Sequence, residues 1–119
     1  MNADIIRIDA PSSSPAGDQV TVDVSVKNIS GSDQYVAVTG AFDSTTISFQ
    51  FDYLLLSPGQ TVIFRGVFTM PSMNVRVTAW SWFWDGSTWV YDDQMTKDIT
   101  LAVSTPQISE FQISDFSKV

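Results

Sequence analysis

The fold of this chain is decided by the stretch DQVTVDVSVKN, residues 18–28. Valine occupies every second position from Val20 to Val26, and the positions between carry threonine, aspartate and serine. Side chains alternate between the two faces of a β-strand, so this pattern predicts a strand with one buried and one solvated face. Valine also packs well on a pleated sheet, which strengthens the prediction.

The same alternation recurs along the rest of the chain. The further apolar sets are Val62, Phe64, Phe68 and Met70; Val75, Val77, Ala79 and Phe83; and Ile99, Leu101 and Val103. Gly66 shares the parity of the first of these sets, at a point where we expect no room for a large side chain. Shorter candidate strands cover residues 5–9, 35–42 and 46–51.

Turn-forming residues separate these stretches, and no segment shows a capped helical period. The turn signals lie at residues 11–17, 30–33, 57–59 and 85–88. About seven short strands at intervals of roughly a dozen residues, without helices, predict an all-β antiparallel β-sandwich. A barrel of about eight strands is the alternative, but the strand count falls short of it.

The composition describes one domain that needs neither disulfide nor metal to fold. The chain has 119 residues, of which 44% are hydrophobic, and it has no cysteine and no histidine. We assign residues 1–105 to the sandwich and residues 106–119 to a C-terminal arm or a final strand. Without cysteine or histidine there is no thiol nucleophile, no Ser-His-Asp triad and no zinc site of the usual kind, and we expect no cofactor.

The charge and hydropathy of the chain exclude two further classes of partner. Six basic residues face thirteen acidic ones, a net charge of −7, whereas nucleic-acid binding needs a basic surface. No apolar run approaches the roughly 20 residues of a membrane span, so we expect no membrane insertion. No signal peptide is visible in the chain.

Residues 18–28 and the stretch LSPGQTVIF at residues 56–64 resemble the CARDB-type immunoglobulin-like domains, which are related to fibronectin-III-like modules. The resemblance covers residues 3–103. It implies an immunoglobulin-like sandwich and a non-catalytic role, as a spacer, an adhesion module or a part of a virion surface. The pattern WxWDGxxWxxDD at residues 82–93 is similar to hairpins in immunoglobulin-like domains of viral structural proteins.

That aromatic segment predicts a hairpin that turns at Asp85-Gly86. If the set from Val75 to Phe83 faces the core, three tryptophans lie along the outside of one strand, and the returning strand brings two more rings to them. The candidate partner-binding or glycan-binding residues are Trp80, Trp82, Trp84, Trp89 and Tyr91. A bulge near Ser81 would reverse this assignment and bury the tryptophans.

An exposed stripe of this size needs a cover, because monomers rarely leave so large an apolar patch bare. The first candidate cover is a loop or the tail of the same chain. The second is another copy of the protein or a neighbouring structural protein. The third is a sugar stacked on the tryptophan rings, with Asp92 and Asp93 accepting hydrogen bonds from its hydroxyl groups.

Carboxylate pairs are the remaining route to catalysis or metal binding. Glycosidases use two carboxyl groups in a cleft, and Asp85 with Asp92 or Asp93 is such a pair. Hairpin tips rarely form clefts, so we predict no catalytic residue. No Asp-x-Asp-x-Asp-Gly calcium loop is present, and we predict no metal site. We expect Asp92-Asp93 to form a solvated turn.

The tail carries four large apolar residues in a five-residue micro-repeat: Ile108, Phe111, Ile113 and Phe116. One interpretation is a final strand packed on its own domain. Another is an arm that adds a strand to the sheet edge of a neighbour. The third is the beginning of a following domain.

These features together predict a structural or interaction module without enzymatic activity. We expect it to belong to a virion, as a capsid, decoration or tail-associated protein, or to a surface appendage. Its expected partners are proteins, either itself or a neighbouring structural protein. We expect it on the virion or the extracellular surface. The alternative is a carbohydrate-binding or adhesion module that uses the tryptophan stripe.

Overall fold

The alternating stretch quoted first forms strand β3 (Gln19–Asn28), and its four valines are buried. The structure is a computed structural model that describes residues 2–102. Its other strands are β1 (Ala3–Asp9), β2 (Ser13–Ser14), β4 (Gln34–Phe42), β5 (Thr45–Thr46), β6 (Ser48–Phe49), β7 (Leu54–Leu56), β8 (Thr61–Thr69), β9 (Val75–Trp84) and β10 (Trp89–Leu101).

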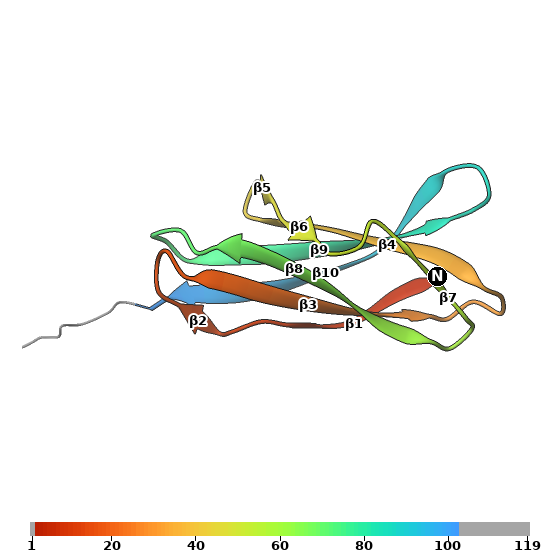
Figure 1. Cartoon of the computed structure of the whole chain (residues 1–119), viewed down its shortest axis with the longest axis horizontal. Helices are drawn as coiled ribbons and strands as arrows, with labels where there is room; N and C mark the ends of the chain where they lie inside the picture. The colour runs from red at the N-terminus through yellow and green to blue at the C-terminus, as the bar shows by residue number, and fades with distance from the viewer. Residues whose placement is uncertain (1, 103–119) are drawn as a thin grey trace, which may run out of the picture.

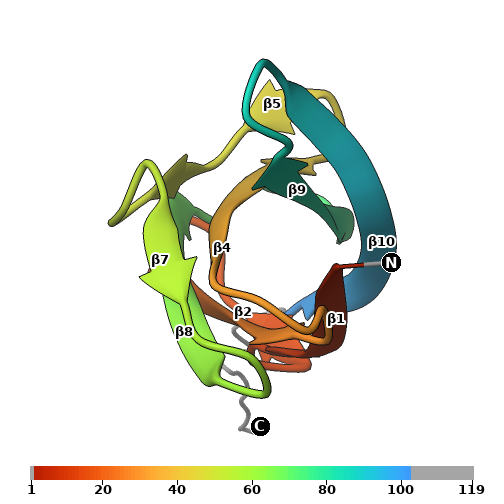
Figure 2. The same ribbon diagram turned by 90° about the vertical axis from the view of Figure 1, so that its right-hand side faces the viewer.

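These strands form two sheets packed face to face (Figure 1). One sheet has the order β1-β3-β8-β6, and the other has the order β2-β10-β9-β4-β5 with β7 paired to β4. Neighbouring strands are antiparallel, except that β2 runs parallel to β10. The end-on view in Figure 2 shows the two sheets around one core. The predicted all-β sandwich is therefore confirmed.

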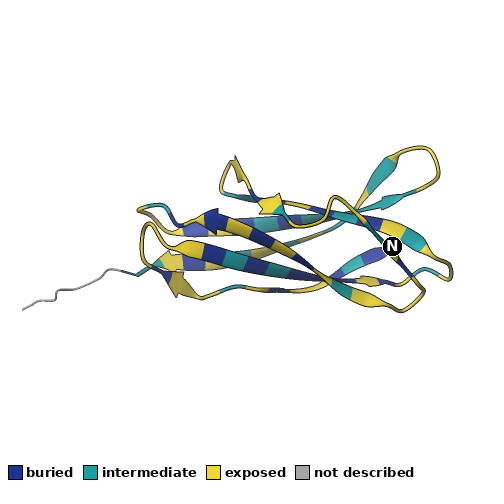
Figure 3. Ribbon diagram, viewed as in Figure 1, coloured by how far each residue is buried: buried dark blue, intermediate teal, exposed yellow. Residues whose placement is uncertain are grey.

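The core is built from the inward faces of the alternating sets, as the bands of buried residues in Figure 3 show. Phe64 and Phe68 of β8 and Val77 and Ala79 of β9 are buried, while Arg65 and Val67 on the opposite face of β8 are exposed. Burial of these side chains contributes roughly 25 cal/mol per Å² of apolar surface removed from water. Val103, the last residue predicted for the final set, lies outside the described residues.

The predicted single strand at residues 46–51 is instead two short strands in different sheets. β5 pairs with β4, and β6 pairs with β8. Ile47 lies between them and is buried. A Cβ atom on Gly66 would lie 2.8 Å from Ile47 Cγ2 and 2.9 Å from Phe49 Cε1, so the expected lack of room at Gly66 is confirmed.

Strand β10 is longer than predicted, since it runs unbroken from the aromatic hairpin to Leu101. Its polar middle gave no strand signal, because much of this edge strand faces solvent. Strand β2, inside the predicted loop at residues 11–17, lies along the far end of β10, where Thr100 N–H donates to Ser12 O and Ala102 N–H to Ser14 O. The N-terminal segment therefore covers part of an otherwise open sheet edge.

The two ends of the sandwich differ. The β9–β10 hairpin projects at one end, and the described part of β10 finishes at the other (Figure 1). No helix among residues 2–102 is long and apolar enough to cross a membrane.

Candidate functional site

The tryptophans of β9 lie on the outer face of the sandwich, as the alternation predicts. Ser81 is buried, while Trp80, Trp82 and Trp84 are partly exposed. A bulge does occur here, but the register shift lies between Tyr91 and Asp93 of β10. Strand β9 itself stays regular, so the direction of its tryptophans is not reversed.

The returning strand brings its aromatic rings onto those of β9, which confirms the predicted cross-strand contacts. Trp89 pairs with Trp84, and Tyr91 pairs with Trp82. The ring centroids are 5.5 Å apart in the first pair and 5.8 Å apart in the second, and both pairs meet edge to face. This is the favoured geometry for aromatic pairs.

Sequence reasoning missed two tyrosines that complete this surface. Tyr53 lies in the loop before β7, with its ring 6.0 Å from that of Trp89 and 5.6 Å from that of Tyr35 on β4. Tyr35, Tyr53 and Tyr91 are 44%, 54% and 49% exposed. We call the whole set the aromatic surface: Tyr35, Tyr53, Trp80, Trp82, Trp84, Trp89 and Tyr91. The alternation in β4 could have identified Tyr35, because consecutive side chains of a strand point to opposite faces and the next residue, Val36, is buried.

Hollows lie between the rings of the aromatic surface. The aromatic pocket, about 280 Å³, is lined by Tyr35, Tyr53, Trp84 and Trp89. A second hollow of about 380 Å³ is lined by Ala37, Thr39, Asp52, Tyr53, Trp82 and Trp89. Trp82 Nε1–H donates to Thr39 Oγ1 at 2.9 Å, and this hydrogen bond restricts the orientation of its indole.

The hairpin turn is organised by Asp85, as predicted. Its Oδ1 accepts the backbone N–H groups of Ser87 at 2.8 Å and Thr88 at 2.9 Å, and Gly86 has a φ of 101°. The N–H groups of Thr88 and Ser87 lower the pKa of the Asp85 carboxyl group. The charge of Asp85 therefore stabilises the turn. A catalytic pair would instead need a carboxyl group that is free to react.

Asp92 and Asp93 do not form the solvated turn that the sequence suggested. They lie at the β10 bulge and hold the beginning of β1. Asp92 Oδ2 accepts the N–H groups of Asn2 and Ala3, and Asp93 Oδ2 accepts that of Ile5 at 2.9 Å. These carboxylates are engaged with backbone, which takes them away from the role of sugar acceptors.

The same cluster perturbs a third acid on β1. Partial burial, a hydrogen bond with Asp93 and the negative charges of Asp93 and Asp92 raise the pKa of Asp4. Nearby, the buried Ser81 hydroxyl donates to Ala3 O at 2.6 Å and accepts the N–H of Asp93 at 3.1 Å. This network joins the aromatic hairpin to the N-terminal strand.

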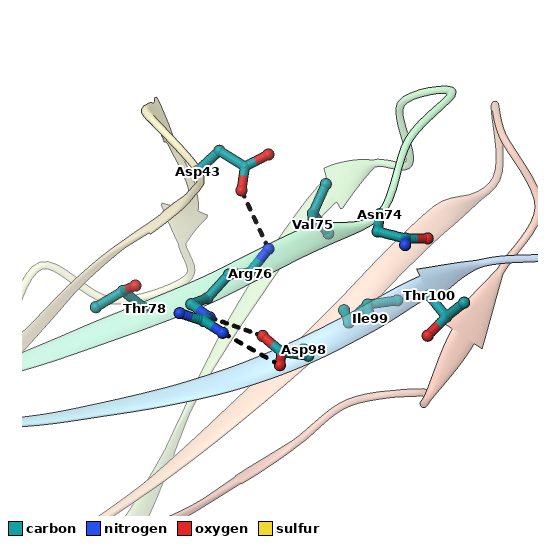
Figure 4. A pocket seen from close by; sticks show the side chains of 8 residues that line it. All are labelled: Asp43, Asn74, Val75, Arg76, Thr78, Asp98, Ile99 and Thr100. Carbon is teal, nitrogen blue, oxygen red and sulfur yellow. Dashed lines mark hydrogen bonds and ion pairs between the residues drawn. The ribbon is translucent and has the colours of Figure 1, made fainter.

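A polar hollow of about 630 Å³ lies away from the aromatic surface and includes Asp43, Asn74, Arg76 and Asp98 (Figure 4). Arg76 Nε donates to Asp98 Oδ1 at 2.8 Å, and this hydrogen bond lowers the pKa of Asp98. Asp43 accepts the N–H of Arg76 at 3.2 Å. An ionised carboxylate paired with an arginine is poorly suited to act as a general acid.

Two sequence predictions remain untested: the expected lack of a metal site and the role of the C-terminal arm. Among residues 2–102, no three His, Cys, Asp or Glu side chains are grouped to hold a metal ion. The arm residues Ile108, Phe111, Ile113 and Phe116 lie outside the described residues, and their role stays a prediction.

Comparison by sequence finds no matching family model and no matching curated protein. Comparison by structure finds the CARDB domain of the PF1109 protein from Pyrococcus furiosus, solved in complex with di-metal ions. The TM-score is 0.59 at 16% identity, over 85% of this chain and 90% of that one. Alpha-2-macroglobulin from Escherichia coli matches with a TM-score of 0.59 at 20% identity, over 86% of this chain and 17% of that one.

A FixG-related protein from Vibrio parahaemolyticus is also similar, with a TM-score of 0.57 at 10% identity, over 87% of this chain and 99% of that one. At such identities the likeness concerns the fold. The strand order, the buried alternating faces and these neighbours together show that the chain has an immunoglobulin-like β-sandwich fold of the CARDB and fibronectin-III-like type.

Proposed function

We propose that this chain is a non-catalytic protein-interaction module, and that it serves in the assembly of a virion or a surface appendage. The observation that supports the proposal is the aromatic surface, which gathers seven rings from β4, β9, β10 and the loop before β7. Tryptophan and tyrosine are the side chains most enriched at the centres of protein interfaces.

The aromatic surface is prepared for binding. The hydrogen bond from Trp82 to Thr39 and the cross-strand ring pairs restrict the side chains before contact. Ordering an interface side chain on binding costs about 0.5–1.5 kcal/mol, so rings that are already held lose less entropy. Rigid aromatic groups on a rigid hairpin suit a protein that must fit one neighbour repeatedly.

The predicted C-terminal arm supplies a second contact in this proposal. Its apolar residues Ile108, Phe111, Ile113 and Phe116 suit strand addition to the sheet of a neighbour. A sandwich with an aromatic surface and an arm has two separate points of attachment. We place the protein on the virion or the extracellular surface, as part of the same proposal.

Carbohydrate binding is the second candidate function, and one observation favours it. The hollow beside the aromatic pocket has the carboxylate of Asp52 and the hydroxyl of Thr39 next to Trp82 and Trp89. An aromatic face with an adjacent carboxylate suits a sugar ring. Against it, Thr39 Oγ1 already accepts a hydrogen bond from Trp82, and Asp92 and Asp93 are engaged with β1.

Photo-cross-linking in the source organism tests the proposal directly. A photoreactive residue replaces Tyr53 in one variant and Ile63, on the outer face of β8, in the other. The two positions are matched, since they are 54% and 50% exposed. We expect position 53 to cross-link to a discrete protein and position 63 to give no such product.

A carbohydrate partner gives a different result in the same design. Cross-linking of position 53 to glycan alone, with a shift of tryptophan fluorescence on adding neutral oligosaccharides, would replace the proposal with the second candidate. Equal cross-linking from both positions would remove the aromatic surface from the function. Light scattering on the full chain and on a chain ending at residue 106 tests the arm, whose removal should dissociate any oligomer that it holds.

A further inference from the structure

The segments that build the aromatic surface carry negatively charged side chains and no positively charged ones. The segments that build it are residues 31–39, 50–56 and 80–94, and they contain no lysine and no arginine. They contain five aspartates: Asp33, Asp52, Asp85, Asp92 and Asp93. Asp52 lines the hollow next to the aromatic pocket, and Asp85 is held in its ionised form by the backbone of its own turn.

The described arginines pair with acids elsewhere on the molecule. Arg65 pairs with Asp23 on the outer face of the other sheet, at 2.8 Å. Arg7 pairs with Asp9 on β1, and Arg76 pairs with Asp98 away from the hairpin tip. Most of the positive charge in residues 2–102 is therefore balanced locally, while the aspartates around the aromatic surface leave a negative field at that end.

The aromatic pocket is shaped to surround a small group. Its four rings meet at steep angles: 81° between Tyr35 and Tyr53, 48° between Tyr53 and Trp89, and 65° between Trp84 and Trp89. Rings at such angles line a hollow from several sides. Its volume of about 280 Å³ is at or below the lower end of the range for small-molecule sites, which suits a single side chain.

We propose that the aromatic pocket binds a lysine or arginine side chain, presented by a basic segment of a partner protein. Aromatic faces attract cations within about 6 Å, and tryptophan does so best. The surrounding carboxylates add attraction at longer range and steer a basic partner toward this end. This inference rests on the proposed function and names the chemistry of the partner.

A second copy of the same surface is a poor occupant on the same grounds. Two copies meeting face to face would bring the acidic segments of each against those of the other, and like charges across an interface are costly. The predicted arm, residues 107–119, has two acids and only one lysine, Lys118. Neither the aromatic surface nor the arm carries a net positive charge.

Peptide titration of the full chain tests the inference without any mutation. The probe is a short peptide of alternating lysine and glycine, followed by tryptophan fluorescence at low ionic strength. The matched peptide has norleucine, the neutral analogue, in place of each lysine. We expect the lysine peptide to bind about tenfold more tightly or better, and to weaken as salt is raised to about 0.5 M.

Two variants locate the binding, and two controls accompany them. Tyr53→Leu keeps an apolar side chain but removes a ring, and should weaken the lysine peptide about tenfold. Asp52→Asn removes one charge and should weaken it a few-fold. The controls are Ile63→Ala, on the outer face of β8, and Asp18→Asn, at an exposed loop position. Both controls should leave the affinity for the lysine peptide unchanged. Tyr53 lies in an exposed loop, so Tyr53→Leu should not impair folding.

Three results would overturn the inference. Equal binding of the norleucine peptide would make the pocket simply apolar. Tighter binding of a peptide of residues 107–119 would make the arm its occupant, and tighter binding of a neutral oligosaccharide would make it a sugar site. The inference and the proposed function fail separately. If position 53 cross-links to a protein but the lysine peptide shows no preference, the interaction module stands and only the basic partner is lost.

Discussion

Strands β8 and β9 are both alternating strands within their sheets, yet their outer faces are opposites. On β8 the outward side chains include Ile63, Val67 and Arg65, which is paired with Asp23. On β9 the corresponding positions toward the hairpin carry Trp80, Trp82 and Trp84. The outer face of β8 is mixed and has its charge balanced, while the hairpin end of β9 is aromatic and its own segment, residues 80–94, carries acids but no basic residue.

This difference shows where the sandwich is free to vary. The inward faces of both strands are constrained by the shared core, whereas outward positions affect stability little. The same alternation therefore builds a neutral face on one sheet and a candidate binding face on the other. Each of the following experiments tests one part of that contrast.

Truncation of an inward residue should have the largest effect. Phe64→Ala should lower the free energy of unfolding by about 3–5 kcal/mol, because Phe64 is fully buried and its loss leaves a cavity. The neighbouring outward change, Ile63→Ala, should cost less than about 1 kcal/mol. Urea unfolding followed by tryptophan fluorescence measures both. Equal losses would mean that the two faces of β8 are not distinct.

The inward face of β8 should also reject added volume at one position. Gly66→Ala places a methyl group against Ile47 and Phe49 and should cost about 1–3 kcal/mol. The clash involves side chains alone, so a second change, Phe49→Leu, should recover part of the loss. Gly31→Ala is the control, since nothing lies within 4 Å of its added carbon. Thermal unfolding of the parent protein, the two single variants at Gly66 and Phe49 and the double variant measures the coupling between these positions. Additive losses would contradict the packing described.

The aromatic hairpin is joined to the beginning of β1 by carboxylates of β10. Asp92→Ala removes the acceptor of the Asn2 and Ala3 N–H groups and should cost about 1–3 kcal/mol. Amide hydrogen exchange should become faster at Ala3, where β1 begins. Asp33→Ala, in the exposed loop before β4, is the matched loss of an acid. Unchanged exchange at Ala3 in the Asp92 variant would show that the carboxylate does not hold β1.

The smallest effect concerns the pH dependence of the hairpin turn. The folded state lowers the pKa of Asp85 below the ordinary aspartate value of 3.8, so its charge favours folding above that pH. This contribution should be lost as the pH falls through the lowered pKa. Asp85→Asn keeps the oxygen that accepts the Ser87 and Thr88 N–H groups but cannot titrate, so its thermal stability should fall less steeply below about pH 4. Parallel profiles for the two proteins would contradict this role.

Much of the fold was predictable because alternation is local. The buried valines of β3 and the outward tryptophans of β9 follow from a period of two, which needs no knowledge of the neighbouring strands. The aromatic pairs across the hairpin were predictable as well, since the Asp85-Gly86 turn sets the register of both strands.

Other features depend on contacts between distant segments. Tyr53 joins the aromatic surface because the loop before β7 passes beside the hairpin. Asp92 was expected in a solvated turn, but β1 lies next to it and its carboxylate accepts hydrogen bonds from that segment. The division of residues 46–51 between two sheets follows from the space above Gly66, which Ile47 and Phe49 fill.

The order of residues alone was enough to establish the sandwich class, the inward and outward faces and the absence of thiol and imidazole chemistry, because these depend on composition and on the geometry of a single strand. The aromatic pocket, the carboxylates engaged with β1 and the strand switch at Ile47 required the folded chain. Each joins residues separated by many positions, and packing of the whole core determines which of them meet.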